Sequence, residues 1–255
     1  NIKIAVDDSV SQVALNEEQV IRHARGFAPQ VIKVKQGLAT LACGSDLKNT
    51  FCLSNGKFAF LSHYTGSLNN LESYQRFKDN IAHYQKLYQI EPQLIAHDLH
   101  PNYYTTQYAK KLLGKKVAVQ HHHAHLVSCM VEHQIEGPVI GIAFDGLGLG
   151  TDGNLWGGEF FICDYSDFMR VGHLNYLAQP GGDKAAKEPW RMAVSYLVDS
   201  RLEGAVDEMQ IFKSRPTKEV VKMIEQDINS PQTSSIGRLF AAVAALLGLC
   251  SKRSY

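Results

Sequence analysis

Between residues 93 and 145 the chain alternates short apolar runs with segments of helical spacing. Three runs of strand length enclose two segments of helical length, in chain order 93–96, 103–113, 116–119, 124–133 and 139–144. Strands that alternate with helices of this length usually pair in one sheet, with the helices packed on its faces. The sequence therefore predicts an α/β fold, in which the last of these strands stops at Asp145.

The rest of the chain fits the same class. Apolar side chains at residues 71–88 recur on one face of a helix, and the Asn-Gly pair at 55–56 lies between two β-prone runs, which predicts a hairpin. Residues 185–228 are expected to be mostly helical, and residues 235–249 form a strongly apolar helix after a capping segment. Residues 1–34 are too few to bury a core of their own.

Charge and hydropathy exclude several classes of partner. The chain carries 26 Lys and Arg against 25 Asp and Glu, a formal net charge of +1. No global field therefore attracts it to nucleic acid or to an anionic membrane. The longest apolar stretch, at 239–249, is too short to cross a bilayer, and the first residues show no secretion signal. We therefore expect neither a nucleic-acid nor a membrane partner.

The five cysteines are odd in number and form no CxxC pair. This spacing argues against a disulfide framework or a zinc knuckle and predicts buried or partly buried free thiols in a reducing compartment, the cytoplasm. The apolar neighbours of Cys129 predict that its thiol is buried and inert. Because the chain does not begin with Met, we expect it to be a piece of a longer protein.

Four histidines occupy five positions at 121–125, between a predicted strand and a predicted helix. On a helix, His121 and His125 lie one turn apart on the same face, where two imidazoles can bind one divalent ion. His122 and His123 are expected to point away from that face. The alternative is a polar turn, or core histidines bonded to the backbone. No Glu follows His121, which excludes the HExxH motif of zinc peptidases.

Glycine recurs at every second position after Asp145, as Gly146, Gly148 and Gly150. Glycine lets backbone amides approach a phosphate closely, and an aspartate at a strand end can hold a metal or orient a water. The pattern matches neither GxGxxG nor GxxxxGKS/T, which excludes the Rossmann and P-loop interpretations. Aspartate-glycine turns of this kind are typical of phosphate-binding hairpins in actin-like ATPases. The alternative is a glycine-rich hairpin without a ligand.

A second turn of small residues, at 44–50, carries Asp46, Lys48 and Asn49. A lysine in a turn is usually only solvated, but this turn also joins two β-prone runs. We predict that it faces the Asp145 hairpin across a cleft and that both turns contact the phosphates of a nucleotide. A further glycine turn at 181–184 is interpreted as structural.

Seven segments in order resemble the HypF family of carbamoyltransferases. They are DLKNTF at 46–51, the segment 98–101, HHHAH at 121–125, the segment 145–153, LWGGE at 155–159, PGGD at 180–183 with PWR at 189–191, and the segment 237–250. The resemblance covers most of residues 35–255. It implies the family's C-terminal domain, which is similar to TsaD and has the actin-like (ASKHA, ribonuclease H-like) fold. Residues 1–34 resemble the end of the family's YrdC-like domain, where Ser9 and Arg22 would contact the nucleotide.

The resemblance implies a reaction in the maturation of nickel–iron hydrogenase. ATP, with Mg²⁺, and carbamoyl phosphate would give carbamoyl adenylate, and the carbamoyl group would pass to the C-terminal cysteine of the partner HypE. His121 and His125 would correspond to the family's paired metal ligands, and Asp145 to the carboxylate at the glycine hairpin. We predict Asp145 as a third ligand of the same metal and all three residues as catalytic. The metal would be zinc or iron, since both accept imidazole and carboxylate ligands.

The sequence also departs from the family. It ends before the segment where the family carries its last metal-ligating aspartate and a second glycine-rich loop, and it has Ala241 where the family usually has aspartate. We therefore expect the catalytic carbamoyl-transfer part of an ATP-using enzyme, in a truncated domain that is inactive by itself. The alternative is a non-catalytic piece that binds HypE or the rest of HypF. An actin-like sugar or acyl kinase is disfavoured, because such kinases hold magnesium with carboxylates and water rather than histidines.

Overall fold

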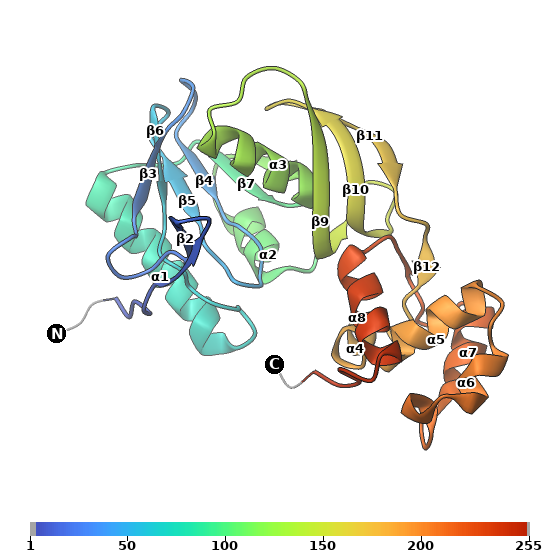
Figure 1. Ribbon diagram of the computed structural model, residues 1–255. Coiled ribbons are helices and arrows are strands. Elements are labelled where there is room, and N and C mark those ends of the chain that lie inside the picture. The colour runs from blue at the N-terminus through green and yellow to red at the C-terminus, as the bar shows by residue number, and fades with distance from the viewer. Residues whose placement is uncertain (1–3, 254–255) are drawn as a thin grey trace. The chain divides into compact units, whose positions relative to one another are not determined.

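The computed structural model describes residues 4–253 of the chain. It divides into two compact units, the first ending at Val119 and the second beginning at Gln120 (Figure 1). Both units combine sheet and helix, so the α/β class is confirmed. Among the described residues, no helix is both long enough and apolar enough to cross a membrane.

The first unit is built on a mixed six-stranded sheet. In sheet order its strands are β3 (Gln30–Lys33), β6 (Phe58–Leu61), β5 (Cys52–Ser54), β4 (Thr40–Ala42), β7 (Leu94–Asp98) and β8 (Lys115–Val119). Strands β4, β7 and β8 are parallel, and the others pair antiparallel. The β5–β6 pair confirms the hairpin predicted at 55–56. A separate small sheet pairs β1 (Val10–Ala14) with β2 (Glu17–Arg22).

Two helices complete this unit, α1 (Leu71–Tyr88) and α2 (Tyr104–Lys111). The bounds of α1 agree with the predicted helix, since Asn70 caps its first turn by accepting a hydrogen bond from the amide of Ser73. The face of α1 that carries Phe77, Ile81 and Tyr84 packs into the core formed with the sheet. The predicted domain boundary after residue 34 falls just beyond β3, which pairs with β6 in this sheet.

The second unit contains a five-stranded sheet and six α-helices within the described residues. The sheet runs β11 (Phe168–His173), β10 (Leu155–Cys163), β13 (Gln232–Thr233) and β12 (Leu177–Ala178), and β9 (Val139–Leu149) pairs with β10. The helices are α3 (His121–Glu132), α4 (Asp183–Lys187), α5 (Trp190–Asp199), α6 (Gly204–Glu208), α7 (Thr217–Glu225) and α8 (Ile236–Leu246), with a 3₁₀ turn η1 at Gln210–Phe212. Residues 185–228 are mostly helical, as predicted.

Two separate cores hold this unit together. Helix α3 packs on β9 and β10 around Met130, Trp156 and Phe161. Helices α7 and α8 both pack on α5 around a core that includes Trp190 and Val220 (Figure 1). The core around Met130 and Trp156 positions the histidine cluster, because its contacts hold α3 against β9, the strand that carries Asp145.

The structure corrects two predicted element bounds. Strand β9 does not stop at Asp145 but runs on to Leu149, so Gly146 and Gly148 lie in the strand, while Gly150 begins the turn at 150–154. The pairing of this longer strand with β10 shifts register at a bulge between Trp156 and Gly158. Helix α3 begins at His121 rather than at 124, because the side chain of Gln120 caps it.

A third correction concerns Cys129. Its thiol was predicted to be buried, but it is exposed, because α3 turns Met130 toward the sheet and Cys129 away from it. The other four cysteines are buried or half-buried, and all five are free thiols, as predicted.

Candidate metal centre and its surroundings

His121, His125 and Asp145 bring three possible ligand atoms together in the second unit. The Nε2 atoms of His121 and His125 lie 3.2 Å apart, and Nε2 of His121 lies 3.2 Å from Oδ2 of Asp145. One ligand atom from each residue lies within 4.8 Å of the other two. Two imidazoles and one carboxylate are a donor set that suits zinc or iron. The residues therefore fit a divalent metal ion.

The fold explains why these three side chains meet. His121 and His125 are one turn apart at the start of α3, and Asp145 lies on β9, which packs along that helix. The side chain of Gln120 joins the two elements, since its Oε1 accepts from the amide of His123 at 2.9 Å and its Nε2 donates to the carbonyl of Leu149 at 3.2 Å. The helix start is thereby tied to the end of β9.

The carboxylate of Asp145 is held in its ionised form. Burial by itself would raise its pKa, but the nearby imidazoles of His121 and His122 and a hydrogen bond from the Gly146 amide outweigh burial and hold the pKa of Asp145 well below its usual range. The Gly146 amide donates to Oδ1 at 2.6 Å, which leaves Oδ2 facing the histidines. The side chain is therefore ready to act as a metal ligand at neutral pH.

The two middle histidines behave differently from each other. His122 was predicted to point away from the pair, and this is wrong: its ring is fully buried, and Nε2 lies 3.6 Å from Oδ2 of Asp145. His123 does point away, and its Nε2 lies 2.8 Å from the carbonyl oxygen of Asp164. His122 thus lies between α3 and β9, on the buried side of the cluster formed by His121, His125 and Asp145.

Gly148 in β9 and Gly150 directly after the strand have packing reasons of their own. A Cβ on Gly148 would lie 2.5 Å from Cε1 of His122 and 2.9 Å from Cβ of His121, and a Cβ on Gly150 would lie 2.1 Å from Nε1 of Trp156. Gly148 therefore makes room for the histidine rings and Gly150 for an indole. A Cβ on Gly146 would meet only Nη2 of Arg238, at an ordinary 3.5 Å. Phosphate binding by these three glycines stays a prediction.

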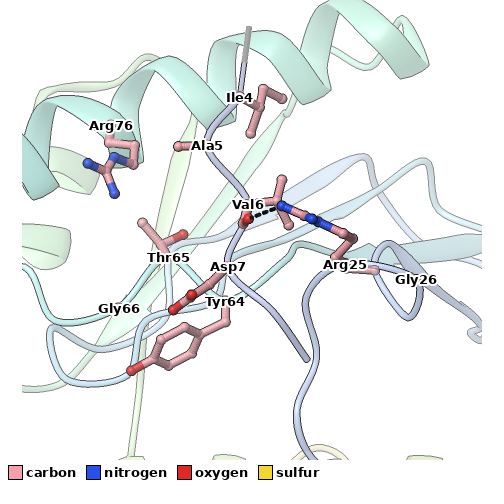
Figure 2. A pocket seen from close by; sticks show the side chains of 11 residues that line it. Ile4, Ala5, Val6, Asp7, Arg25, Gly26, Tyr64, Thr65, Gly66 and Arg76 are labelled. Carbon is pink, nitrogen blue, oxygen red and sulfur yellow. Dashed lines mark hydrogen bonds between the residues drawn. The ribbon is translucent and has the colours of Figure 1, made fainter. Parts of the chain in front are cut away.

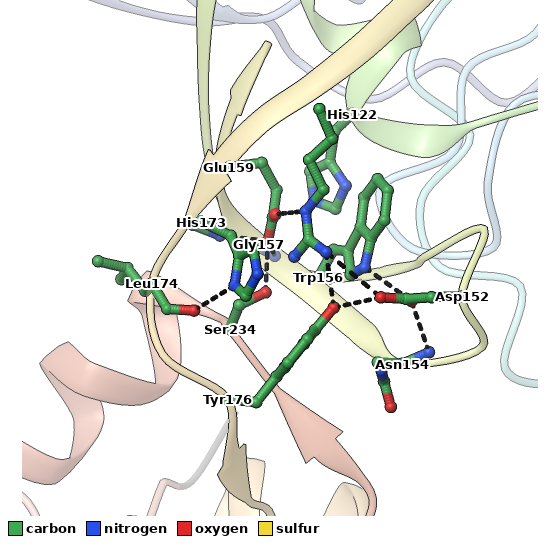
Figure 3. A network of polar contacts seen from close by, with 12 residues as sticks. His122, Asp152, Asn154, Trp156, Gly157, Glu159, His173, Leu174, Tyr176 and Ser234 are labelled. Atoms are coloured by element: carbon green, nitrogen blue, oxygen red, sulfur yellow. Dashed lines mark hydrogen bonds and ion pairs between the residues drawn. The ribbon is translucent and has the colours of Figure 1, made fainter.

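A polar network that the sequence did not suggest braces the turn after β9 (Figure 3). Arg170 donates to Oε2 of the fully buried Glu159 at 2.6 Å and lies over the ring of Trp156, 4.0 Å from its centre. Asp152, in the turn, accepts from Nε1 of Trp156 at 2.9 Å and from the hydroxyl of Tyr176 at 2.6 Å. The signal that could have revealed the network is a pair of opposite charges inside two neighbouring apolar strands.

The turn at 44–50 in the first unit uses its polar side chains to hold its own shape. Asp46 caps helix α2, accepting from the amides of Tyr104 at 2.8 Å and Thr105 at 3.0 Å. Asn49 is buried and donates to the carbonyls of Cys43 and Ser45, while Lys48 is exposed. Nucleotide binding by these three residues stays a prediction, as does their placement opposite Asp145, which belongs to the other unit.

Ser9 and Arg22 also have partners within the first unit. The Ser9 hydroxyl donates to the carbonyl of Arg25, and Arg22 pairs with Asp7 at 3.2 Å. A pocket lies beside them, lined by residues of the N-terminal segment, of 25–28 and of 64–66, and by Arg76 (Figure 2). Neither Ser9 nor Arg22 lines it, so their predicted nucleotide contacts remain untested.

Comparison with known proteins identifies matches along most of the chain. The family described as HypF Kae1-like domain matches residues 35–132, and the family described as Carbamoyltransferase, Kae1-like Domain, second subdomain, matches residues 141–255. Carbamoyltransferase HypF2 of Cupriavidus necator is 43% identical over 244 residues, which is 93% of this chain and 30% of that protein. The chain thus spans about a third of the length of the curated relatives it matches.

Two crystal structures are similar over 98% of this chain. Full-length HypF in the phosphate- and nucleotide-bound form is 43% identical with a TM-score of 0.92, and this chain covers 33% of it. HypF of T. kodakarensis is 35% identical with a TM-score of 0.88, and this chain covers 35% of it. The Kae1-like matches are consistent with the predicted actin-like ATPase fold.

Proposed function

This chain belongs to the HypF family, of which it carries the Kae1-like region, and from that premise we propose that it is the carbamoyl-transfer part of an ATP-dependent carbamoyltransferase. The relatives are named carbamoyltransferases, and one similar structure holds phosphate and nucleotide. In the proposed reaction, carbamoyl phosphate and ATP give carbamoyl adenylate, and the carbamoyl group passes to the C-terminal cysteine of HypE.

The observation that carries this proposal is the convergence of His121, His125 and Asp145 on one point. A divalent ion held there would act as a Lewis acid that polarises the carbamoyl oxygen. The chain's own contribution is a rigid frame: Gln120 fixes the helix start, and the ionised Asp145 is held by Gly146 and the histidines. Such preorganised groups stabilise developing charge without rearranging during the reaction.

The nucleotide, together with Mg²⁺, is proposed to bind at the glycine-bearing end of β9. Among Gly146, Gly148 and the following Gly150, only Gly146 has no aromatic or imidazole ring in the space that a side chain would occupy. Backbone at such a glycine can approach a phosphate closely.

In the transfer step a thiolate attacks the carbamoyl carbon, a carbon–sulfur bond forms, and the bond from that carbon to the phosphate oxygen breaks to release AMP. The proposed thiolate is that of the partner HypE. Cys129 is the competing candidate, because its thiol is exposed one helical turn after His125.

A non-catalytic scaffold is the second candidate function. It is favoured by Ala241, which is buried in α8 at a position where the family usually has aspartate. Such a protein would bind HypE or the rest of HypF without transferring the carbamoyl group.

The deciding experiment follows labelled carbamoyl from carbamoyl phosphate to HypE, with ATP, using full-length HypF that carries this sequence. His121→Ala, His125→Ala and Asp145→Ala should each abolish transfer, whereas Cys129→Ser should leave it largely intact. Loss of transfer in folded Cys129→Ser would move the chemistry onto this chain's own thiol. Binding of HypE without any transfer by the unsubstituted sequence would support the scaffold instead.

A further inference from the structure

Arg238 is a buried cation that lacks a counterion in its immediate surroundings. It lies in the first turn of α8 and is 6% exposed. Its Nε and Nη1 atoms have no hydrogen-bond partner within residues 4–253. Arg191, the other buried arginine described in this unit, is paired with Glu188 at 2.6 Å, and the half-buried Arg170 is paired with Glu159 at 2.6 Å. Arg238 is therefore the exception among the buried arginines described here.

Its position in the helix makes this burial costlier. The first turn of a helix carries partial positive charge from its free amides, which disfavours a cation and favours an anion. Helix α8 has no acidic residue in that turn. Burial lowers the pKa of Arg238, and Arg253 lowers it further, while Asp145 and Asp183 oppose this through weaker attraction. A buried charge left without a close partner usually destabilises a fold substantially.

The surroundings place this cation next to the metal centre. The Ser235 hydroxyl, which caps α8, lies 3.0 Å from the carbonyl oxygen of Asp145 and 2.9 Å from that of Gly146. A Cβ on Gly237 would lie 2.9 Å from Cα of Gly146, so the first turn of α8 is pressed directly onto β9. Nη2 of Arg238 lies beside Gly146, 3.5 Å from where its Cβ would be.

We propose that Arg238 and the N-terminal end of α8 form an anion site that binds a phosphoryl group beside Gly146. The identity of the anion rests on the proposed function, in which ATP and carbamoyl phosphate both present phosphoryl oxygens. Arginine suits this ligand because its guanidinium stays charged and offers several N–H donors to phosphate oxygens. The site gives the second unit a positively charged phosphate contact from α8, beside the strand that carries Asp145.

The test measures binding of inorganic phosphate and thermal unfolding at constant ionic strength, with chloride replacing phosphate. Three proteins are compared: the unsubstituted chain, Arg238→Met, and Lys218→Gln, which removes an equal charge from an exposed site on α7. Phosphate should raise the unfolding temperature of the unsubstituted chain and of Lys218→Gln in a saturable manner. Arg238→Met should bind phosphate about 10- to 100-fold more weakly, the range expected for one lost charge-assisted contact.

Stability without phosphate provides an independent readout. Because Met removes an unpaired buried charge, Arg238→Met should unfold at the same or a higher temperature than the unsubstituted chain in chloride. A guanidinium that serves only to support the fold would give the opposite result, with lower stability and an unchanged response to phosphate. If Arg238→Met does not fold, Arg238→Lys replaces it and should show a smaller loss of phosphate affinity.

Parallel titrations with ATP and with carbamoyl phosphate distinguish the source of the phosphoryl group, since the physiological ligand should show the larger loss in Arg238→Met. Equal phosphate affinity in all three proteins, or no phosphate response in any, would overturn the site. Neither result would bear on carbamoyl transfer, which is measured separately on HypE, so the two proposals can fail independently.

Discussion

Nε2 of His121 lies 3.2 Å from Nε2 of His125, across one turn of α3. With metal–nitrogen bonds of about 2.0–2.1 Å, two nitrogens bound to one tetrahedral ion lie about 3.3 Å apart. The two rings are therefore already spaced as ligands of a single ion. Asp145 approaches the same point from β9, with Oδ2 3.2 Å from the first ring and 4.0 Å from the second.

The first prediction is that this cluster binds about one divalent ion per chain. His121→Ala and His125→Ala should each lower metal affinity by more than about 10-fold, since each removes a direct ligand. Metal content of the purified proteins, measured by plasma mass spectrometry, checks this. His133→Ala, which removes an exposed histidine at the end of the same helix, should keep its metal. Equal metal content in all four proteins would show that the cluster is not a metal site.

A second prediction separates two glycines of β9. Gly148→Ala should disturb the metal site, because its Cβ would lie 2.5 Å from the ring of His122 and 2.9 Å from His121. Gly146→Ala should keep the metal, because its Cβ would meet only Arg238 at 3.5 Å. Both variants are checked by metal content and by circular dichroism. Full metal binding in Gly148→Ala would mean that α3 moves freely relative to β9.

The third prediction concerns the ion pair of Arg170 and Glu159. Arg170→Met leaves the fully buried carboxylate without its cation, and removal of one partner of a buried pair costs about 3–5 kcal/mol. Denaturant unfolding should show this loss, while Lys218→Met on exposed α7 should change stability by less than about 0.5 kcal/mol. Adding Glu159→Gln to Arg170→Met should restore part of the stability. A double variant no more stable than the single one would contradict the buried-charge explanation.

The fourth prediction is a pH dependence that comes from His63. Burial lowers the pKa of this histidine below its usual 6.5, with repulsion from His83 as a smaller cause. Below pH 6.5 the unfolded chain therefore takes up a proton that the folded chain does not. The contribution of His63 to stability is complete above pH 6.5 and falls as the pH drops toward the folded pKa, by at most about 1.4 kcal/mol per pH unit.

The matched variant is His63→Gln, which can still bond to Tyr84 and Asn80, the ring's present partners. Unfolding of both proteins is followed between pH 7.5 and pH 5.5. The unsubstituted chain should lose more stability over this range than the variant does. Parallel curves would show that His63 is protonated as easily in the folded chain as in the unfolded one.

Features that depend on neighbours along the chain were predictable from the sequence. The hairpin at 55–56, the helix at 71–88 and the common face of His121 and His125 follow from turn chemistry and helical periodicity. These rules involve residues within a few positions of one another, so no knowledge of the fold is needed. The same holds for the ordered motifs that resemble the HypF family.

Features that depend on which elements pack together were not predictable. Helical spacing predicted that His122 points away from the face of His121 and His125. In the structure α3 packs against β9, and this packing brings the His122 ring close to Asp145. Likewise, Cys129 is exposed although local sequence predicted a buried thiol, and Asp46 caps α2, a structural role that local sequence did not reveal. In each case a segment distant in the sequence determines which partner the side chain contacts, or whether it is exposed to solvent.

The sequence by itself determined the α/β class, the family and the two histidines that share a helical face. Asp145 was also predicted from the sequence as their partner, but only the tertiary structure shows how closely the three side chains approach and that Arg238 is buried without a close counterion. The reason is that a side chain's direction on its own helix or strand follows from local geometry, whereas its burial and its partners follow from contacts between segments far apart in sequence.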